Sequence, residues 1–542
     1  MEKNKPSIIF PEEFNINSFE YHGFIVHYKG FLYVDGFKSG RDSILEILEN
    51  MAQTSKFDFC AIKGSYVVSI EHKPTGMRWL FADNSGQMKF YYGQNTISPS
   101  FLMVLDNEKP SASDLNPRAI NDFLHFGFVY FNETFFKSIQ ALSKDDFFEI
   151  DRHGNRKICK KEIPELHGPV KFNFHDHFKN FALALQSYNN ISADLTGGFD
   201  SRLIVAMLMY FDVDFEMAVS GRQGIKDIKI PAKIAEILQK PFYITYHDAT
   251  KLREADLRKI FEMVDSQMDV ISYHRNYQFN LDRKKRKVDM QLNGSGGALY
   301  KDFWWLQDFP FYKKKKSNIE KLYKYRIEAV EFPHYLLGDQ LRTVSQKFKN
   351  NTIQKLFDYR LTYNTQTYDN INYNHKTQNA SAYITAASRF FNCTAPLLEL
   401  DLARFGFSQK RSTRFFNNFH KEYITKYYPQ ISKIKTTERV RCSSHTKDKI
   451  FDVFNYLYDK QIRLTMQILR KTLKKTYLQE SPTDKRIYNI VRNFPITDDI
   501  ENILKKYEII SRDTFLKKVK DQYLGRFISL GMLLERMEQN RK

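Results

Sequence analysis

Short hydrophobic runs interrupted by turn residues occupy the chain from about residue 20 to residue 150. Runs of this length, in which apolar and polar positions alternate, are typical of β-strands. The segments 72–76 and 83–86 contain the glycine, proline, asparagine and aspartate residues that favour chain reversals. These patterns predict a mostly antiparallel β domain, with one helix near Ser43 to Ala52. The expected strands are Phe24 to His27, Phe31 to Val34, Phe59 to Ile62, Tyr66 to Ile70, Arg78 to Phe81 and Lys89 to Tyr92.

After about residue 165 apolar strands and apolar helices alternate. A strand, a helix and a second strand in this order form a βαβ unit, and repetition of the unit favours a parallel sheet. The chain beyond about residue 315 is expected to be mainly helical, with basic amphipathic stretches at Lys321 to Val330 and Ile450 to Leu478. The expected strands are Ile191 to Leu195, Phe215 to Ser220 and Phe242 to Tyr246, and the helices between them are Ser201 to Tyr210 and Ile228 to Leu238.

The length of 542 residues exceeds what one hydrophobic core normally supports, so at least two domains are expected. A composition of 42% hydrophobic and 15% aromatic residues excludes a disordered chain. The sequence thus predicts an α/β protein. Residues 1–165 form an antiparallel, β-rich domain, and residues 166–542 form a parallel-sheet domain with a helical C-terminal extension.

The formal net charge of +20 favours anionic partners such as nucleic acid, nucleotides, membrane surfaces or acidic metabolites. The basic residues cluster at 283–287, 313–316 and 471–475. Such clusters are usually solvated faces or loops. Aromatic residues do not alternate with them as they do in a base-stacking platform, which argues against nucleic acid as the partner.

The four cysteines lie far apart and have no histidine at metal-ligand spacing, so neither a zinc site nor a disulfide framework is indicated. A reducing compartment fits this pattern. No apolar segment approaches the roughly 18 residues that a membrane helix needs, and the first residues lack the hydrophobic region of a signal peptide. We therefore expect a cytoplasmic protein without a membrane span.

A glycine turn lies between an apolar strand and an apolar helix and reads Asp194-Leu-Thr-Gly-Gly-Phe-Asp-Ser-Arg202. Two glycines let the backbone approach a ligand closely, and the N–H groups at the start of the helix favour phosphate. Thr196 and Ser201 add hydroxyl groups, and Asp200 adds a carboxylate suited to Mg2+. An ordinary strand-to-helix turn is the alternative, but it does not account for the complete string.

This string resembles the S-G-G-x-D-S pyrophosphate loop of ATP pyrophosphatases, and its surroundings resemble the asparagine synthetase family. Phe215 to Gly221 is similar to the family's second strand, whose end lies against the adenine. Asn293 to Tyr300 is similar to its second glycine-rich motif, and Ala395 to Leu402 to its "P-F-L-D-x-D-L" segment. The order and spacing agree with the family over about residues 165 to 440.

The resemblance implies that the C-terminal domain binds ATP and Mg2+, with Asp200 as the metal ligand. A lysine is also implied to stabilise charge during amide formation. Lys435 fits its spacing best, Lys433 is the alternate, and a solvated lysine is equally compatible. The residues implied to bind the nucleotide are Leu195, Thr196, Gly197, Gly198, Phe199, Asp200, Ser201, Val219, Gly221, Gly294, Ser295, Gly296 and Gly297.

The second glycine motif departs from the family. The family has a glutamate between its first two glycines and an acidic pair after them, whereas this chain has Ser295 and then Ala298 and Leu299. Asp302 is a candidate substitute for the lost carboxylates. The departures predict weaker metal binding or none.

The N-terminal region resembles the glutaminase (Ntn-type) domain of the same family, chiefly in the strands from Phe59 to Tyr92 and in the segments 120–127 and 136–142. The family's nucleophile is a cysteine directly after the initiator methionine, and here that residue is Glu2. Cys60 is expected to be a buried strand residue. We therefore expect a degenerate glutaminase domain, so that glutamine is not the nitrogen donor.

Three functions are compatible with these features. The first is an ATP-dependent amide ligase that joins a small-molecule or peptide carboxylate to an amine, as in the related β-lactam synthetases and lasso-peptide cyclases. The second is a catalytically inactive relative that binds a nucleotide or a protein partner, which Ser295 and Ala298 favour. The third, nucleic-acid binding, has the least support. A second copy of the chain, in a homodimer, is a further candidate partner.

Overall fold

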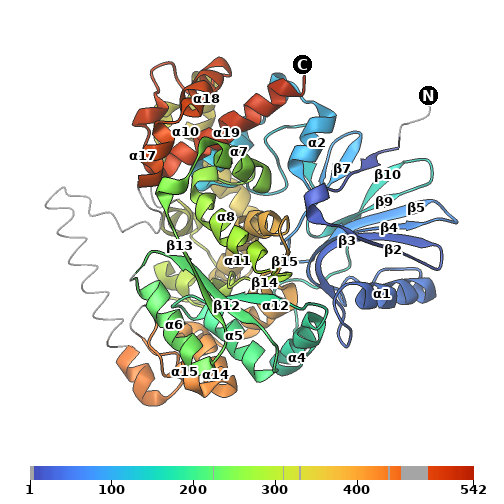
Figure 1. Cartoon of the computed structure of the whole chain (residues 1–542), viewed down its shortest axis with the longest axis vertical. Coiled ribbons are helices and arrows are strands. Elements are labelled where there is room, and N and C mark those ends of the chain that lie inside the picture. Colours follow the sequence, from blue (N-terminus) through green and yellow to red (C-terminus); the bar gives the residue numbers. More distant parts are fainter. Residues whose placement is uncertain are drawn as a thin grey trace.

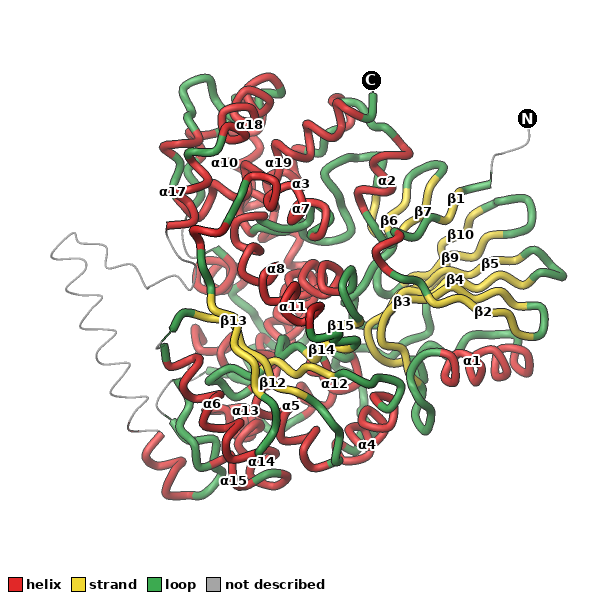
Figure 2. Tube along the Cα trace, viewed as in Figure 1, coloured by secondary structure: helices red, strands yellow, loops and turns green. Residues whose placement is uncertain are grey.

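The computed structural model describes residues 5–223, 225–308, 311–328, 331–437, 440–452, 454 and 486–541 (Figure 1). Glu2 and most of the basic stretch from Ile450 to Leu478 lie outside these residues. The described residues form three sheets, two of them in the N-terminal part and one in the C-terminal part, where most of the helices lie (Figure 2). Among the described residues, no helix is both long and apolar enough to cross a bilayer.

The N-terminal part is built on a six-stranded antiparallel sheet in the order β10-β9-β5-β4-β3-β2. A smaller sheet has the order β1-β7-β6-β8. The strands are β1 (Ser7–Ile8), β2 (Asn17–Tyr21), β3 (Phe24–Tyr33), β4 (Lys63–His72), β5 (Met77–Ala82), β6 (Tyr91–Tyr92), β7 (Thr96–Ser98), β8 (Gln140–Ala141), β9 (Asp146–Ile150) and β10 (Arg156–Lys160), and the helices are α1 (Arg41–Thr54), α2 (Phe101–Glu108) and α3 (Pro117–Phe126).

Alternate side chains of the large sheet enter different hydrophobic clusters. Tyr66 and Val68 of β4 pack with Ile44 and Leu48 of α1, whereas Val67 belongs to the cluster shared with the C-terminal part. This is the two-residue period of a strand that is buried on both faces. The expected antiparallel β region and its helix are confirmed.

Two expectations about this region are wrong. Phe24 to His27 and Phe31 to Tyr33 belong to one strand, β3, which pairs with β4 without interruption. Gly30, between the two segments, approaches β4 so closely that a Cβ atom would lie 2.1 Å from the Ser65 carbonyl oxygen. Phe59 to Ile62 forms a turn rather than a strand, and Cys60 on this turn is exposed rather than buried. Phe59 and Ile62 are buried in the cluster around α1, so packing of a turn explains their hydrophobicity.

The C-terminal part is built on a five-stranded parallel sheet in the order β13-β12-β11-β14-β15. Figure 1 shows α5 and α6 on one side of this sheet and α8 and α11 on the other. The parallel sheet is confirmed, and the described residues beyond about 315 are mainly helical, as expected. The strands are β11 (Ile191–Asp194), β12 (Glu216–Gly221), β13 (Phe242–Tyr246), β14 (Met290–Leu292) and β15 (Asn392–Thr394), and the main helices up to β15 are α4 (Phe174–Leu185), α5 (Asp200–Tyr210), α6 (Lys226–Leu238), α7 (Glu254–Met263), α8 (Val270–Lys285), α9 (Ile319–Leu322), α10 (Asp339–Leu356) and α11 (Asn364–Ala387).

The helices that follow β15 in the sequence pack against both the N-terminal and the C-terminal part. C-terminal α19 packs against α3 of the N-terminal part and against α7 and α8. Its Arg536 forms an ion pair with Asp106 of α2. One hydrophobic cluster also contains residues from both sides of residue 165, among them Phe31 and Leu203. The domain boundary at residue 165 stays a prediction. These helices are α12 (Leu400–Ser408), α13 (Arg411–Arg414), α14 (Asn418–Tyr427), α15 (Pro429–Ser432), α17 (Arg486–Arg492), α18 (Pro495–Lys506) and α19 (Asp521–Gln539).

Candidate functional site

The candidate site lies where the strand order of the parallel sheet reverses. β11 pairs with β12 on one side and with β14 on the other. The chain leaves β11 into α5 on one face of the sheet and reaches β14 from α8 on the other (Figure 1). Ligands of open α/β sheets bind beyond the carboxyl ends of the strands at such a point. Both glycine segments begin at these strand ends.

The first glycine segment is a compact turn that leads directly into α5. The Thr196 N–H donates a hydrogen bond to the Ser201 hydroxyl oxygen at 2.9 Å, and the two hydroxyl oxygens lie 3.1 Å apart. A Cβ atom on Gly197 would lie 2.5 Å from Thr437, whereas one on Gly198 would meet only the Thr196 hydroxyl, at 3.6 Å. The turn is therefore packed on one side and open at Gly198.

The second glycine segment packs against the start of α5. A Cβ atom on Gly297 would lie 1.9 Å from the Asp200 carboxyl carbon, and one on Gly294 would lie 3.2 Å from the Ser201 Cβ atom. Gly296 adopts a φ of 100°, which favours glycine, and a Cβ atom there would lie 2.9 Å from the Leu397 carbonyl. The structure thus brings the two sequence-predicted motifs together.

Asp200 has basic neighbours that were not among the residues predicted from the sequence. Lys301 Nζ lies 2.8 Å from Asp200 Oδ1, and His420 Nε2 lies 3.1 Å from the same oxygen. Burial opposes ionisation of the Asp200 carboxyl, but Lys301 and His420 outweigh it and hold the pKa of Asp200 well below its usual value. Lys376 of α11 also interacts electrostatically with Asp200 and Lys301, and burial lowers the pKa of this lysine. The predicted metal ligand is therefore an ionised carboxylate that already has a cationic partner.

The side chains around Asp200 do not fit a bound Mg2+. The ion prefers several oxygen ligands in octahedral geometry. Among the described residues, no group of three or more His, Cys, Asp or Glu side chains is arranged to hold a metal. Asp302, the candidate substitute, has its pKa raised to about 6 by burial, against the charges of Arg414 and Arg326. Asp302 is therefore more readily protonated than an ordinary aspartate, and Asp200 belongs to no metal-binding group of this size among the described residues.

A cavity of about 280 Å³ lies beside the two glycine segments. Of the residues predicted to bind a nucleotide, it contacts Thr196, Val219 and Ser295. Its opposite wall consists of polar and aromatic side chains of α8 and α11. These are Tyr273, Arg275, Asn276, Phe279 and Asn280 of α8 and Asn379 and Tyr383 of α11. A concave site with a few convergent polar groups is the usual form of a small-molecule site.

Arg275 is half-buried in this wall. Its side chain forms no ion pair or hydrogen bond with any residue that the structure describes. The other charged residue of the wall, Asp194, is paired with Arg283 and Gln291. The cavity thus presents one guanidinium group that is available to an anionic ligand.

Lys435 and Lys433, the sequence candidates for catalysis, are exposed. Lys435 Nζ lies 5.8 Å from the centroid of the Phe451 ring and not in the cavity wall. The surrounding segment nevertheless contacts the first glycine turn, because the Thr437 N–H donates to the Gly197 carbonyl at 3.1 Å. A catalytic role of Lys435 stays a prediction.

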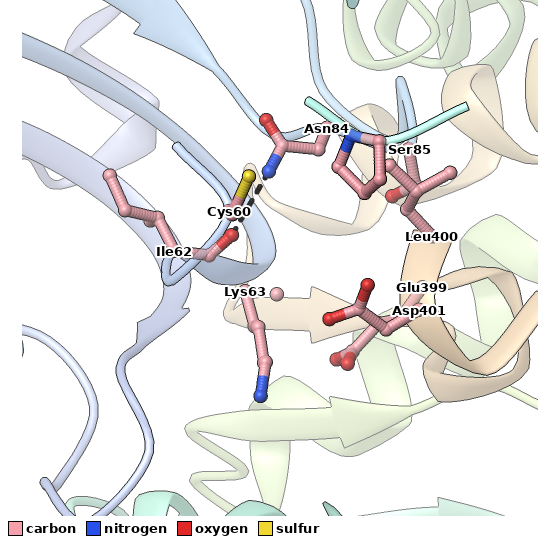
Figure 3. A pocket seen from close by; sticks show the side chains of 10 residues that line it. Cys60, Ile62, Lys63, Asn84, Ser85, Glu399, Leu400 and Asp401 are labelled. Carbon is pink, nitrogen blue, oxygen red and sulfur yellow. Dashed lines mark hydrogen bonds between the residues drawn. The ribbon is translucent and has the colours of Figure 1, made fainter. Parts of the chain in front are cut away.

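The segment Ala395 to Leu402 links the site to the N-terminal sheet. On one side, Tyr300 donates a hydrogen bond to the Leu397 carbonyl at 2.9 Å, close to Gly296. On the other side, Glu399 and Asp401 face Lys63 of β4 across a small pocket that Cys60 also lines (Figure 3). Glu399 accepts a hydrogen bond from Tyr33 at 2.9 Å. The segment therefore supports the second glycine segment and forms part of the contact between the two parts of the chain.

We expect Glu399→Gln to reduce the pH dependence of stability. Burial raises the pKa of Glu399 to about 8, against the Tyr33 hydrogen bond and the charge of Lys63, while Asp401 and Asp35 add to the rise. A carboxyl with a raised folded-state pKa contributes stability that is fully present below its unfolded pKa of about 4.3 and is lost as pH rises to about 8. The variant should be more stable than the parent at pH 8.

Urea unfolding between pH 5 and pH 8 checks this expectation. The exposed Glu162→Gln variant is the matched control and should follow the parent. A Glu399→Gln variant whose stability falls with pH as steeply as that of the parent would show that Glu399 is ionised in the folded protein throughout this range.

No protein-family model matches the chain, and no curated protein matches it. Among solved structures, the chain is similar to a glutamine-dependent NAD+ synthetase from Acinetobacter baumannii in complex with ADP. The identity is 16% over 36% of this chain and 33% of that chain, with a TM-score of 0.14. The match thus covers about a third of each protein.

Proposed function

We propose that this chain binds ATP in the cavity beside the two glycine segments and uses it to join a carboxylate to an amine. The observation that carries the proposal is the convergence of these segments, from the adjacent strands β11 and β14, at the reversal point of the sheet. Backbone N–H groups at the start of α5 suit the phosphates. The adjoining cavity provides room and polar groups for the remainder of the nucleotide and for a substrate.

The proposed reaction has two steps. A substrate carboxylate oxygen attacks the α-phosphorus of ATP, and the bond from that phosphorus to the bridging oxygen breaks, so that pyrophosphate leaves with the electron pair. The amine nitrogen then attacks the acyl carbon, AMP leaves, and the nitrogen loses a proton. In both steps the chain's part is to hold the reacting groups close together and to stabilise negative charge.

Arg275 is the proposed partner of the carboxylate substrate, because it is the unpaired cation of the cavity wall among the described residues. We expect Arg275→Gln to raise the KM for the carboxylate by about 10- to 100-fold, which corresponds to the loss of one charge-assisted hydrogen bond. The affinity for ATP should be unchanged. Steady-state pyrophosphate release and calorimetric ATP titration measure the two quantities.

The exposed Arg360→Gln variant is the control and should behave as the parent in both assays. An unchanged KM in Arg275→Gln would remove this residue from the substrate site. An equal loss of ATP affinity would place it against the nucleotide instead.

The proposal is tested by pyrophosphate release from ATP in the presence of a panel of carboxylates and amines, including peptides that contain both groups. We expect release that depends on ATP and on a particular carboxylate. A second candidate, a nucleotide-binding protein without ligase activity, is favoured by Ser295 and Ala298 and by the ion pair at Asp200. ATP binding without release for any member of the panel would support that candidate, and no ATP binding would refute both.

A further inference from the structure

We propose that the site holds the phosphates of a nucleotide through Lys301 and not through a magnesium ion on Asp200. This inference rests on the proposed function, because it concerns the same site. The sequence predicted Asp200 as a ligand of Mg2+, but in the structure its carboxylate is paired with the Lys301 ammonium group.

Lys301 is held in place by its neighbours on both sides. The Arg414 guanidinium donates to the Leu299 carbonyl at 2.7 Å and to the Lys301 carbonyl at 3.2 Å. Tyr300 is fully buried and bonded to the Leu397 carbonyl. The side chain of Lys301 itself is 22% exposed and that of Asp200 is 30% exposed. The backbone is thus fixed, while the ammonium group remains within reach of a ligand.

The groups around the carboxylate are cationic or basic. Lys301 and His420 contact Asp200 Oδ1, and Lys376 interacts with both Asp200 and Lys301. His420 is fully buried, and its Nε2 atom lies against the Asp200 carboxylate. Its Nδ1 atom has no hydrogen-bond partner among the described residues. One carboxylate among two lysines and a histidine leaves positive charge beside the first glycine turn.

A divalent cation on Asp200 would have to displace the Lys301 ammonium group and remain next to it. Ser295, Ala298 and Leu299 offer it no side-chain carboxylate. A polyphosphate, in contrast, gains an ammonium donor in Lys301 and the N–H groups at the start of α5 without displacing any group. Asp200 is then a positioning residue that holds Lys301 in the unliganded protein.

Isothermal titration of the full chain with ATP and with tripolyphosphate, in excess Mg2+ and in EDTA, tests the inference. We expect ATP to bind with nearly equal affinity in both conditions. Lys301→Ala should weaken ATP binding in EDTA by about 10- to 100-fold, whereas Lys301→Arg should stay close to the parent. Lys349→Ala, which removes an exposed lysine of α10, is the matched control and should bind as the parent does.

Asp200→Asn separates the two interpretations without changing the size of the side chain. If Lys301, and not a metal ion on Asp200, holds the phosphates, this variant keeps ATP affinity in EDTA or gains some, because a negative charge near the phosphates is lost. ATP binding that requires Mg2+ in the parent and fails in Asp200→Asn would overturn the inference and leave the proposed function intact. Absence of binding by both ATP and tripolyphosphate would overturn the inference and the proposed function together.

Discussion

Gly296→Val is expected to weaken ATP binding by about 100-fold or more, because a misplacement of about 1 Å at an active site can have an effect of that size. Gly296 adopts a φ of 100°, and a Cβ atom would lie 2.9 Å from both the Leu397 carbonyl and the Leu398 side chain. A β-branched residue cannot adopt this backbone conformation without strain. The second glycine segment must therefore shift relative to Leu397, which disturbs its packing against Asp200 and the position of Lys301.

Calorimetric titration with ATP measures this loss, and circular dichroism establishes that the variant is folded. Gly198→Ala is the control for the fold, since its Cβ atom would meet only the Thr196 hydroxyl at an ordinary contact distance of 3.6 Å. Its melting temperature should equal that of the parent. A folded Gly296→Val protein that binds ATP as tightly as the parent would show that this segment takes no part in the site.

Arg414→Ala is expected to destabilise the protein by about 3–5 kcal/mol, the range found when one partner of a buried ion pair is removed. Arg414 and Asp369 are 1% and 3% exposed, and both terminal nitrogens of Arg414 donate to Asp369, at 2.6 and 2.7 Å. The guanidinium also lies 4.1 Å from the Trp305 ring centroid. Its removal leaves a buried carboxylate without its charge partner and releases the carbonyl groups that flank Tyr300.

Urea unfolding measures the change in the free energy of unfolding. Arg411→Ala is the control, because it removes an exposed arginine of the same short helix that lies over the Tyr312 ring. It should lower the free energy of unfolding by less than about 1 kcal/mol. Equal effects of the two substitutions would contradict the role assigned to the Arg414–Asp369 pair. Arg414→Ala should also weaken ATP binding, because the carbonyl groups of Leu299 and Lys301, on both sides of Tyr300, lose their hydrogen bonds to Arg414.

The architecture could be predicted where the sequence carries local information. The strand, turn and helix around Asp194 to Arg202 are adjacent in the chain, and the observed β11, turn and α5 follow the predicted order. Strands β14 and β15 have only three residues each, which is too short for a periodic pattern. The segment Phe59 to Ile62 was predicted as a strand but forms a turn, because a hydrophobic run can be buried without pairing in a sheet.

The site could be predicted only in part, because several of its side chains come from elements far apart in the sequence. The two glycine segments were identifiable from their residues. Lys301 follows the second segment directly, so a count of charges near that motif would have found it. Arg275, Lys376 and His420 lie on helices without a local motif, and nothing in their sequence neighbourhood marks them. Their role depends on how α8, α11 and α14 pack around the sheet.

Photolabelling with 8-azido-ATP, followed by mapping of the labelled peptides, tests most directly whether ATP occupies the cavity. We expect labelled peptides from the end of β12, around Val219 to Gly221, and from the cavity-lining part of α8, and we expect excess ATP to prevent the labelling. Labelling that excess ATP does not reduce, or that occurs only in segments remote from this cavity, would contradict the assignment of the site.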